Sequence, residues 1–550
     1  IETEQMKIAL AQLNYHVGNF AANTSRIISA INTAEAQGAE LIIFSEQCIC
    51  GYPARDFLEF NDFINHCTEA LDEIAKHTDK IAALVGGPRK NPVAEGKDLY
   101  NSAFFIYEGQ VKHITDKTLL PVYDVFDEYR YFEPNRKFEV FTFKGKRLAI
   151  TICEDIWNVG NDNPLYATCP LDEMVNQQPE LILNLSASPF SYKQHTERMN
   201  VIRANVARYH IPMIYVNQVG AQTELIFDGG SVAVNANGEV AHQSKFFEEE
   251  LAYIDTDNLT SAGTSLAEQT NPMQLIHDGL VLGIRDYFAK LGFKKAILGL
   301  SGGIDSALVL YLAAQALGKE NVLSLLLPSG FSTDHSLADA RQLCQNLDTR
   351  YEVVPIEDNF QQFLKTLNPF FKDLPFSVAE ENIQARVRGV LLMAFSNKFG
   401  YILLNTTNKS EAAVGYGTLY GDMCGGLAVL GDVYKTQVFD LCRYINRNGE
   451  VIPANIISKP PSAELRPNQK DSDSLPEYDI LDKILYQYIE KRQGPKELVN
   501  MGFDQKLVDR VLKMVNGNEW KRFQAPPILR VSPKAFGMGR RMNIEGKYLG

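Results

Sequence analysis

A cysteine, a glutamate and a lysine each follow a stretch of chain that is typical of a buried β-strand. Cys153 comes directly after the apolar run Leu148–Ile152, so a sharp turn at the strand end would hold its sulfur. Glu46 follows the segment Glu40–Phe44, and Lys117 comes soon after another strand. Thiol, carboxylate and ammonium groups at three strand ends are able to meet in one pocket and perform nucleophilic and acid–base chemistry. An isolated cysteine is more often a small buried apolar residue, so the sequence leaves that meeting open.

A second group of chemically suggestive residues lies in the other half of the chain. The strand-like segment Ala296–Leu300 leads into Ser301, Gly302, Gly303, Ile304, Asp305 and Ser306, and a helix follows. The glycines let the backbone approach an oxyanion, and the start of the helix offers free N–H groups. The two serines add hydroxyl donors. The lysine of a Walker A loop is absent, and ordinary turn chemistry would also explain a Gly-Gly pair.

Alternating strands and helices must position the first group. Strands are predicted at Lys7–Leu13 and Glu40–Phe44, with a helix from about Thr24 to Gln37 between them. Asn23 is the predicted N-cap of that helix, and Gly38 is its predicted end. Several later strands lead into polar loops instead of long helices. This pattern favours a layered α/β sandwich over a doubly wound sheet.

The pattern of predicted strands and helices changes after a segment rich in Thr, Ser, Ala and Gly. We therefore predict a first domain over residues 1–257, a linker over 258–272 and a second domain over 273–550. In the second domain, continuous apolar strands alternate with helices, including a long helix over Glu380–Lys398. Repeated βα units with such strands predict a parallel, Rossmann-like sheet.

The first domain resembles the nitrilase superfamily. The resemblance rests on Leu41–Glu46, on the Lys117 segment and on Cys153-Glu-Asp-Ile-Trp157, which match that family's three signatures in the right order. It implies an α/β/β/α sandwich that hydrolyses an amide, with Cys153 as nucleophile, Glu46 as general base and Lys117 stabilising the oxyanion. It further implies Glu128 as a second, positioning carboxylate, and Tyr123 and Ser188 as pocket residues for the glutamine substrate.

The second domain resembles the N-type ATP pyrophosphatases, whose adenine-nucleotide α-hydrolase-like fold carries Ser-Gly-Gly-Ile-Asp-Ser after a strand. These enzymes cleave ATP between its α and β phosphates and adenylate an oxygen of the substrate. The resemblance implies that Ser301, Gly302, Gly303 and Ser306 bind ATP. It also implies that Asp305 binds both ATP and Mg²⁺, a cation that takes oxygen ligands.

Further motifs of this domain resemble NAD synthetases. They lie at Glu381–Gly389, Thr406–Glu411, Tyr420–Asp422, Gly431–Thr436 and Lys459–Leu465. The resemblance implies Glu411 as the second Mg²⁺ carboxylate and Thr406 as an ATP contact. It assigns the deamido-dinucleotide, or its phosphates, to Asn382, Arg386, Asp422 and Lys435. Thr407 stands where the family's run has glycine, so strain is expected there if the position needs positive φ.

Composition and charge narrow the classes of function. The chain of 550 residues exceeds a single core, and 54 basic against 67 acidic residues give a net charge of −13. That balance disfavours bulk binding of nucleic acid, and no apolar run reaches the ~18–20 residues of a membrane helix. Eight scattered cysteines without a CxxC pair favour reduced thiols and a cytoplasmic location.

Together, the two domains resemble the glutamine-dependent NAD synthetase family. Glutamine would supply ammonia, and ATP with Mg²⁺ would activate the nicotinate carboxylate of deamido-NAD, giving NAD, AMP and pyrophosphate. A symmetric homo-oligomer, a dimer or higher, is expected because synthetase domains of this type pair across a two-fold axis. Two alternatives stay open: an amidase fused to a different ATP pyrophosphatase, and a nucleotide-binding regulator with vestigial sites.

Overall fold

The computed structural model describes residues 6–160, 164–259, 270–372 and 374–548, and the chain divides into two compact units. Unit 1 is Ile1–Thr270 and unit 2 is Asn271–Gly550. Most of the predicted linker, residues 260–269, lies outside the described residues. No helix within the described ranges is long and apolar enough to cross a lipid bilayer.

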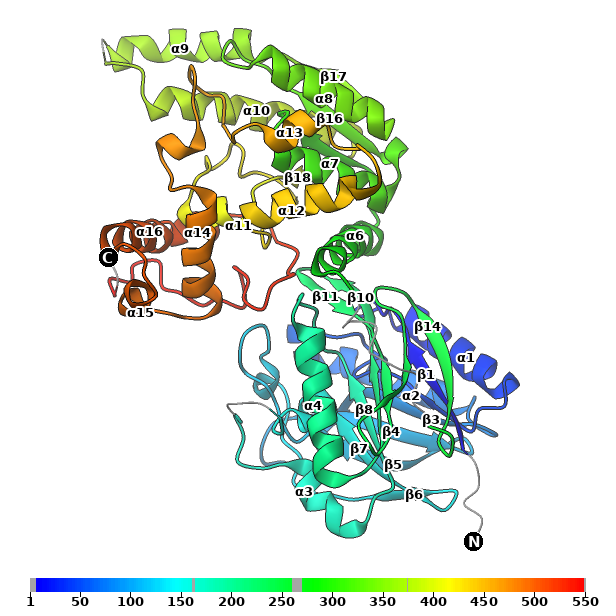
Figure 1. Ribbon diagram of the computed structural model, residues 1–550. Helices are drawn as coiled ribbons and strands as arrows, with labels where there is room; N and C mark the ends of the chain where they lie inside the picture. The colour runs from blue at the N-terminus through cyan, green and yellow to red at the C-terminus, as the bar shows by residue number, and fades with distance from the viewer. Residues whose placement is uncertain (1–5, 161–163, 260–269, 373, 549–550) are drawn as a thin grey trace. The chain divides into compact units, whose positions relative to one another are not determined.

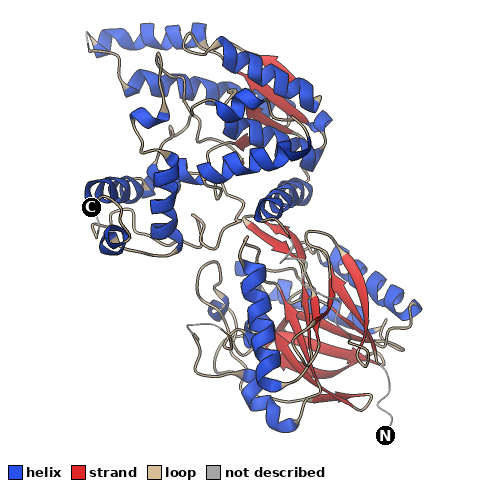
Figure 2. Cartoon of the chain, viewed as in Figure 1, coloured by secondary structure: helices blue, strands red, loops and turns tan. Residues whose placement is uncertain are grey.

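Two six-stranded sheets form the centre of unit 1 (Figures 1 and 2). The first has the order β14 (Glu250–Asp255), β1 (Lys7–Gln12), β2 (Leu41–Ile43), β3 (Ala82–Lys90), β4 (Leu99–Tyr107), β5 (Gln110–Asp116). The second has the order β13 (Val240–Gln243), β12 (Val232–Val234), β9 (Met213–Asn217), β8 (Leu181–Ser186), β7 (Lys146–Ile152), β6 (Phe141–Phe143). A short ribbon of β10 (Val219–Gln222) and β11 (Leu225–Asp228) completes the strands of this unit.

Alternating side chains along each strand divide this unit into four layers. In β1, Ile8 and Leu10 join the apolar cluster between the two sheets, whereas Ala9 and Ala11 face the helices. The outer helices of the first sheet are α1 (Phe20–Ala36) and α2 (Asn61–Ala75), and those of the second are α3 (Pro170–Met174) and α4 (Gln194–Tyr209). The predicted α/β/β/α sandwich is therefore confirmed.

The start of α1 differs from its prediction. The helix begins at Phe20, and its N-cap is Asn19, whose side chain accepts a hydrogen bond from the backbone N–H of Ala22. Asn23 was the predicted cap, but it is buried and donates its side-chain amide to the carbonyls of His16 and Ile49. Both asparagines suit a cap by type, and the tertiary contacts of Asn23 decided between them.

Unit 2 is built on a parallel sheet of five strands. Their order is β17 (Arg350–Val353), β16 (Val322–Leu326), β15 (Ala296–Gly299), β18 (Ile402–Asn405), β19 (Leu427–Ala428). The chain therefore adds strands first on one side of β15, starting with β16, and later on its other side, starting with β18. Ligands of open α/β sheets bind outside the carboxyl ends of the strands at such a switch point. The predicted Rossmann-like sheet is confirmed.

Helices cover both faces of this sheet (Figure 1). On one face, α10 (Val378–Phe399) packs its Val387 and Leu392 onto the apolar side chains of β15, β16 and β18. On the other lie α6 (Pro272–Leu291), α7 (Ile304–Leu317) and α12 (Lys435–Ile445). The remaining helices are α8 (Asp334–Leu347), α9 (Glu357–Phe371), α11 (Lys409–Val414), α13 (Ala454–Ser458), α14 (Tyr478–Leu485), α15 (Pro495–Asn500), α16 (Gln505–Gly517) and α17 (Glu519–Arg522).

Candidate functional site

The turn after β7 holds Cys153 in a strained conformation. Its φ is 43°, in the left-handed region that costs energy for a residue with a side chain. Asp155 fixes the turn: one carboxylate oxygen accepts the N–H of Ile152 at 3.0 Å, and the other accepts the N–H groups of Thr118 and Leu119 at 2.9 and 2.8 Å. The same side chain therefore ties the cysteine turn to the segment that follows Lys117.

The Lys117 ammonium lies between two carboxylates. Its Nζ donates to Glu46 Oε1 at 2.7 Å and to Glu128 Oε1 at 2.8 Å. The lysine side chain is fully buried, and the two carboxylates are 0% and 5% exposed. The structure therefore brings together Glu46, Lys117 and Glu128, three residues that the sequence predicted for one site.

Two further side chains complete this cluster. The amide nitrogen of Asn101, in β4, donates to Glu46 Oε1 at 2.7 Å and to Glu128 Oε2 at 3.4 Å. The Tyr52 hydroxyl donates to Glu128 Oε1 at 2.9 Å. Buried carboxylates need such partners, because an unpaired charge away from water is costly. Neither Asn101 nor Tyr52 belongs to the predicted site, and no motif in the sequence marks them.

Burial and neighbouring charges set the protonation of the cluster. Burial, together with the Glu46 carboxylate, raises the pKa of the Cys153 thiol well above its usual range, while Lys117 acts in the opposite direction. Burial would lower the pKa of Lys117, but Glu128 and Glu46 outweigh it, so that pKa is raised. Burial raises the pKa of Glu128 to about 7. At neutral pH the site thus holds a neutral thiol beside a permanently charged lysine.

Tyr123 lies beside the residue that follows the cysteine. Its hydroxyl donates to Glu154 Oε1 at 2.9 Å, and the Tyr166 hydroxyl donates to the same oxygen at 3.0 Å. Burial raises the pKa of Glu154 to about 7. The ring of Tyr123 is 38% exposed, so it lies at the rim of the site.

Ser188 contacts a separate buried ion pair, which Arg198 forms with Asp228. Its Oγ accepts a hydrogen bond from Arg198 Nη2 at 3.3 Å, and Arg198 pairs with Asp228 at 3.0 Å. Its backbone N–H donates to Asn217 Oδ1 at 2.9 Å. These contacts fix the segment after β8 at the same edge of the sheet as the cysteine turn, because β7 and β8 are parallel neighbours.

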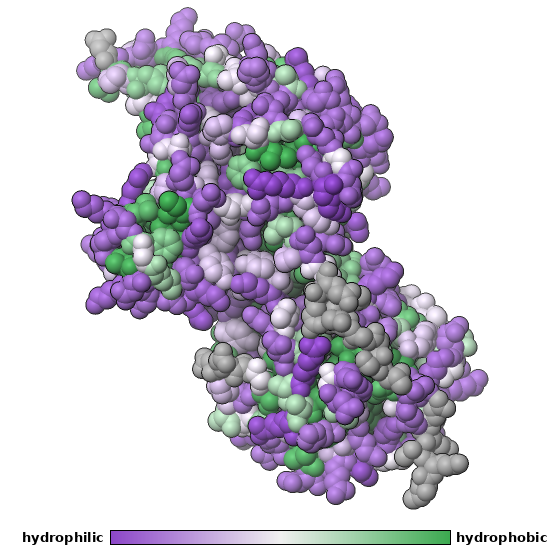
Figure 3. All heavy atoms as spheres, viewed as in Figure 1, coloured by the Kyte–Doolittle hydropathy of each residue, from purple (hydrophilic) through white to green (hydrophobic). Residues whose placement is uncertain are grey.

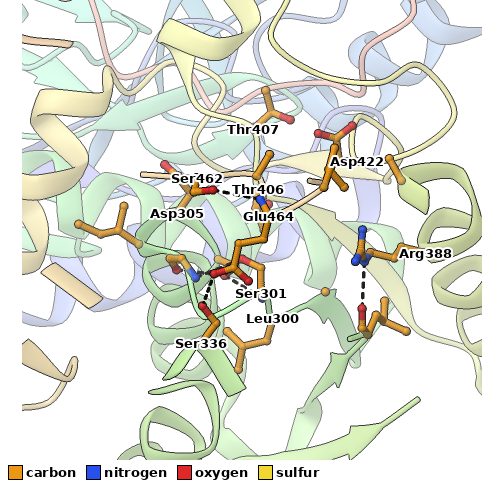
Figure 4. A pocket seen from close by; sticks show the side chains of 18 of the residues that line it. Leu300, Ser301, Asp305, Ser336, Arg388, Thr406, Thr407, Asp422, Ser462 and Glu464 are labelled. Atoms are coloured by element: carbon orange, nitrogen blue, oxygen red, sulfur yellow. Dashed lines mark hydrogen bonds between the residues drawn. The ribbon is translucent and has the colours of Figure 1, made fainter. Parts of the chain in front are cut away.

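In unit 2, a cavity of about 290 Å³ lies at the carboxyl ends of β15 and β18 (Figure 4). Its wall includes the loop after β15, the start of α7 and the segment after β18. The cavity therefore lies at the switch point of the sheet. Of the predicted site residues, eight line it: Ser301, Gly303, Asp305, Ser306, Thr406, Glu411, Asp422 and Lys435.

The loop after β15 is shaped by its glycines and serines. Gly302 has φ of +81°, and a Cβ there would lie 2.3 Å from the Ser336 carbonyl oxygen, so only glycine fits. The Ser301 hydroxyl accepts the N–H of Gly303 at 3.2 Å and lies 3.2 Å from the Ser306 hydroxyl. Because α7 begins at Ile304, its N–H groups and positive end face the cavity, as in anion-binding sites.

A second cluster of charges lies beside this loop. Lys435 pairs with Asp305 and contacts Glu411 at 3.5 Å, and Asn408 donates to the other Asp305 oxygen at 2.9 Å. Burial opposes the charge on Lys435, but Asp305 and Glu411 outweigh it and raise its pKa. Burial, with Asp305 beside it, raises the pKa of Glu411 to about 8. This concentration of negative charge suits a cationic ligand.

Thr406 and Thr407 both line the cavity, after β18 (Figure 4). The N–H of Thr407 donates to Asn405 Oδ1 at 2.9 Å, which forms a local turn. Thr407 is not among the described non-glycine residues with positive φ. The strain that the missing glycine led us to expect is therefore not found, because this turn uses ordinary backbone angles.

Two of the predicted dinucleotide residues act on one neighbouring segment. Asn382 accepts a hydrogen bond from the Thr418 hydroxyl at 2.8 Å, and Arg386 donates to the Leu419 carbonyl at 3.2 Å. Neither of them is among the described residues that line the cavity, whereas Asp422 lines it and accepts the N–H of Thr418 at 2.6 Å. The structure thus places Asn382 and Arg386 behind the wall that contains Asp422.

The sequence prediction missed four charged residues that line this cavity: Arg388, Glu464, Lys459 and Asp471. Arg388 lines it near Asp422, and burial lowers the pKa of its guanidinium to about 10 (Figure 4). Glu464 accepts the Ser336 hydroxyl at 2.6 Å and the Thr333 hydroxyl at 3.1 Å. Arg388 and Glu464 belong to the motif segments Glu381–Gly389 and Lys459–Leu465, so a sequence signal for these segments was present. Only the tertiary structure selects the two residues from their neighbours.

Comparisons with known proteins match a different family to each half of the chain. A family described as carbon-nitrogen hydrolase matches residues 7–263, and one described as NAD synthase matches residues 276–525. A glutamine-dependent NAD(+) synthetase of Synechocystis sp. is 48% identical over 546 residues, 98% of each chain. One of Thermotoga maritima is 40% identical and covers 99% of each chain.

Solved structures give the same result. The glutamine-dependent NAD+ synthetase of Acinetobacter baumannii, solved in complex with adenosine diphosphate, has a TM-score of 0.78 and 38% sequence identity. The similarity covers 98% of both chains. A chain from Cytophaga hutchinsonii, 20% identical with a TM-score of 0.84, shares the fold.

Proposed function

The chain belongs to the glutamine-dependent NAD(+) synthetases, and on this premise we propose which residues carry out each half of the reaction. The enzyme is a ligase that amidates deamido-NAD with nitrogen from glutamine, and its family uses ATP as a substrate. We assign the glutaminase to residues 1–257, the synthetase to residues 273–550 and a linker to residues 258–272. The alternative of an amidase fused to a different ATP pyrophosphatase does not fit this family.

In the glutaminase site, Cys153 attacks the carboxamide carbon of glutamine. Glu46 takes the thiol proton, and Lys117 stabilises the negative charge that develops on the carbonyl oxygen. Glu46 then passes the proton to the leaving nitrogen, so that ammonia departs and a thioester to Cys153 remains. A water molecule, deprotonated by Glu46, hydrolyses the thioester to glutamate. The neutral resting thiol supports this order, because a base must act before the sulfur becomes nucleophilic.

Three further residues complete our assignment of this site. Glu128 holds the ammonium group of Lys117 together with Glu46, as its 2.8 Å contact supports. Tyr123 and Ser188 bind the remainder of the glutamine molecule. Tyr123 lies at the rim beside Glu154, and Ser188 lies at the end of β8, next to the strand end that leads into Cys153.

In the synthetase site, the loop after β15 binds ATP. Ser301, Gly302, Gly303 and Ser306 contact its phosphates together with the start of α7, and Thr406 forms the facing wall. The nicotinate carboxylate of deamido-NAD attacks the α-phosphorus, pyrophosphate leaves, and an adenylate forms. Ammonia then attacks the activated carbonyl carbon and displaces AMP, which gives NAD. Such transfers depend mainly on positioning and on neutralising phosphate charge.

Asp305 and Glu411 fit a magnesium ion. Both are carboxylates in the wall of the cavity, and burial together with the neighbouring Asp305 raises the pKa of Glu411. Mg²⁺ takes oxygen ligands and commonly binds through one or two carboxylates together with phosphate oxygens of a substrate. When bound, the ion would neutralise charge on the phosphates of ATP.

We assign deamido-NAD to Asn382, Arg386, Asp422 and Lys435. Asp422 and Lys435 line the cavity, and Asn382 and Arg386 hold the Thr418–Leu419 segment behind it. Lys435 is placed to contact an anionic group of either substrate, because it lines the cavity and its raised pKa keeps it positively charged. The assignment therefore combines direct contacts with residues that shape the wall.

The proposal includes a homo-oligomer and a cytoplasmic location. Apolar side chains reach the surface around α9 and α10, where Val390 and Phe370 are 66% and 76% exposed (Figure 3). A symmetric partner would cover such a face, and light scattering of the purified enzyme tests for one. All eight cysteines are free thiols, which agrees with a reducing compartment.

The convergence of Glu46 and Lys117 beside the strained Cys153 turn carries the proposal for the glutaminase. The test is Cys153→Ala, assayed for NAD synthesis with either glutamine or ammonia. Glutamine-supported synthesis should fall more than about 1,000-fold, because the nucleophile is gone, while ammonia-supported synthesis is retained. Loss of both activities, or of neither, would overturn the assignment of two separate sites. A regulator with vestigial sites would support neither reaction in the unmodified enzyme.

A further inference from the structure

Asn101 contacts the glutaminase cluster through both its backbone and its side chain. It lies in β4 and is 1% exposed. Its carbonyl oxygen accepts the backbone N–H of Lys117 at 2.8 Å, so the strand sets the position of the lysine. Its side-chain nitrogen donates to Glu46 Oε1 at 2.7 Å and to Glu128 Oε2 at 3.4 Å. One residue therefore contacts every charged member of the cluster.

The two oxygens of Glu46 are not equivalent in this network. Oε1 accepts two hydrogen bonds, from Lys117 Nζ and from Asn101 Nδ2, both at 2.7 Å. Oε2 accepts one, from the backbone N–H of Ala187 at 3.1 Å. A carboxylate oxygen has two lone-pair sites, so Oε1 is fully occupied and Oε2 has one site left for a proton.

We infer that Asn101 is a positioning residue that occupies Glu46 Oε1, and thereby directs the proton from the Cys153 thiol to Glu46 Oε2. This inference rests on the proposed glutaminase, in which Glu46 is the base. Without Asn101, Glu46 would keep one hydrogen bond at each oxygen, from Lys117 at Oε1 and from Ala187 at Oε2, so each oxygen would have one lone-pair site open. The carboxylate would then present either oxygen to the thiol.

The chemistry of an amide suits this position. Glu46 and Glu128 share the ammonium group of Lys117, so two carboxylates face one cation in this cluster. Asn101 supplies a donor to two carboxylates without adding a charge of its own. An aspartate of the same shape would place a third carboxyl between them.

The other half of the same amide argues against a purely structural role. Asn101 Oδ1 is buried and has no hydrogen-bond partner in the part of the chain that the structure describes. A buried acceptor without a partner destabilises the fold, so an apolar side chain of similar size would be the more stable choice. The contacts of the nitrogen with Glu46 and Glu128 account for the amide.

The test compares Asn101→Leu and Asn101→Ser with the unmodified enzyme in a glutaminase assay across pH. Both variants should lower kcat about 100-fold, with KM for glutamine changed less than about threefold, because the base and not the substrate contacts is misplaced. The acid limb of kcat should move up by about one pH unit, since the ionised carboxylates lose a donor that stabilises them. Asn101→Ser keeps the test possible if the leucine variant does not fold.

Asn205→Leu is the matched control. Asn205 is also fully buried, donates two amide hydrogen bonds and has an Oδ1 without a partner among the described residues. Its two amide bonds go to the neutral carbonyls of Ile156 and Val201. It should lose thermal stability without a shift of the acid limb. An unshifted limb in both Asn101 variants would overturn the inference alone. Glutaminase activity that survives in Cys153→Ala would instead overturn the proposed function, and this inference with it.

Discussion

In unit 1, Lys117 is completely buried between Glu46 and Glu128, and the protein itself supplies every partner of these charges. In unit 2, the serines of the loop after β15 and the start of α7 line an open cavity of about 290 Å³. The difference follows from the chemistry that we propose for the two sites. Hydrolysis through a thioester uses a nucleophile and a base that belong to the chain, so the site is assembled before substrate arrives. Adenylation uses phosphates and a cation that arrive with ATP, so the site must leave room for them.

The buried cluster of Glu46, Lys117 and Glu128 is called the closed site below. The largest expected effect comes from removing Lys117, the cation that its two carboxylates share. Lys117→Met should lower glutaminase activity more than about 1,000-fold, because the oxyanion loses its stabilising charge. It should also lower the free energy of unfolding of unit 1 by about 3–5 kcal/mol, since two buried carboxylates lose their partner. A glutaminase assay and a calorimetric scan measure the two effects, and ammonia-supported NAD synthesis should be retained.

A surface lysine of the preceding strand provides the control. Lys112 pairs with Glu108 at 3.0 Å in an exposed (i,i+4) contact, so Lys112→Met should change the free energy of unfolding by less than about 0.5 kcal/mol. Glutaminase activity that persists in Lys117→Met would show that the closed site does not depend on its buried cation, and the contrast with unit 2 would fail.

The cavity of unit 2, called the open site below, should be sensitive to the shape of the loop after β15. Gly302→Ala should lower NAD synthesis about 10- to 100-fold with either nitrogen donor, because the new Cβ would meet the Ser336 carbonyl at 2.3 Å and displace the loop. Glutaminase activity should be retained. Gly303→Ala should have a clearly smaller effect, since its Cβ would meet only the movable Ser301 hydroxyl at 3.2 Å. Equal losses in the two variants would contradict this account of the loop.

The pH dependence of the closed site gives a third comparison. The pKa of Glu128 is raised to about 7, so its carboxyl binds a proton as pH falls through that value and weakens its pairing with Lys117. Glutaminase activity should therefore decrease below about pH 7 by up to tenfold per pH unit. Glu128→Gln, which cannot titrate, should lose this limb. The pKa of Glu154 is also about 7, so a limb that disappears in Glu154→Gln instead would reassign the titration.

The smallest effect is expected at Thr407. Its backbone angles are not in the left-handed region, so Thr407→Gly relieves no strain. NAD synthesis should change less than about threefold, and the free energy of unfolding should fall by about 0.5–1 kcal/mol from the added freedom of the unfolded chain. A large gain in activity, measured with saturating ammonia, would show that the threonine obstructs the cavity.

Much of the fold was predictable because the pattern of apolar residues is local. Strands β1, β2, β7 and β15, the loop at Ser301–Ser306 and the helix after it follow from short stretches of sequence. The proposed site residues Glu46, Lys117 and Cys153 could be selected from the sequence because each follows a buried strand and matches a known signature. The N-cap of α1 was not, since Asn19 and Asn23 are equally suitable by type.

The sequence by itself determined two α/β units, the strand ends that carry the reactive groups and the family to which they belong. The tertiary structure decided which side chains act on those groups. Glu46 and Lys117 are 71 positions apart, and Asp305 and Lys435 are 130 apart. Contacts between residues so distant in the chain leave no periodic or local signal, so the partners of each charge, Asn101 above all, emerge only when the strands are brought into one sheet.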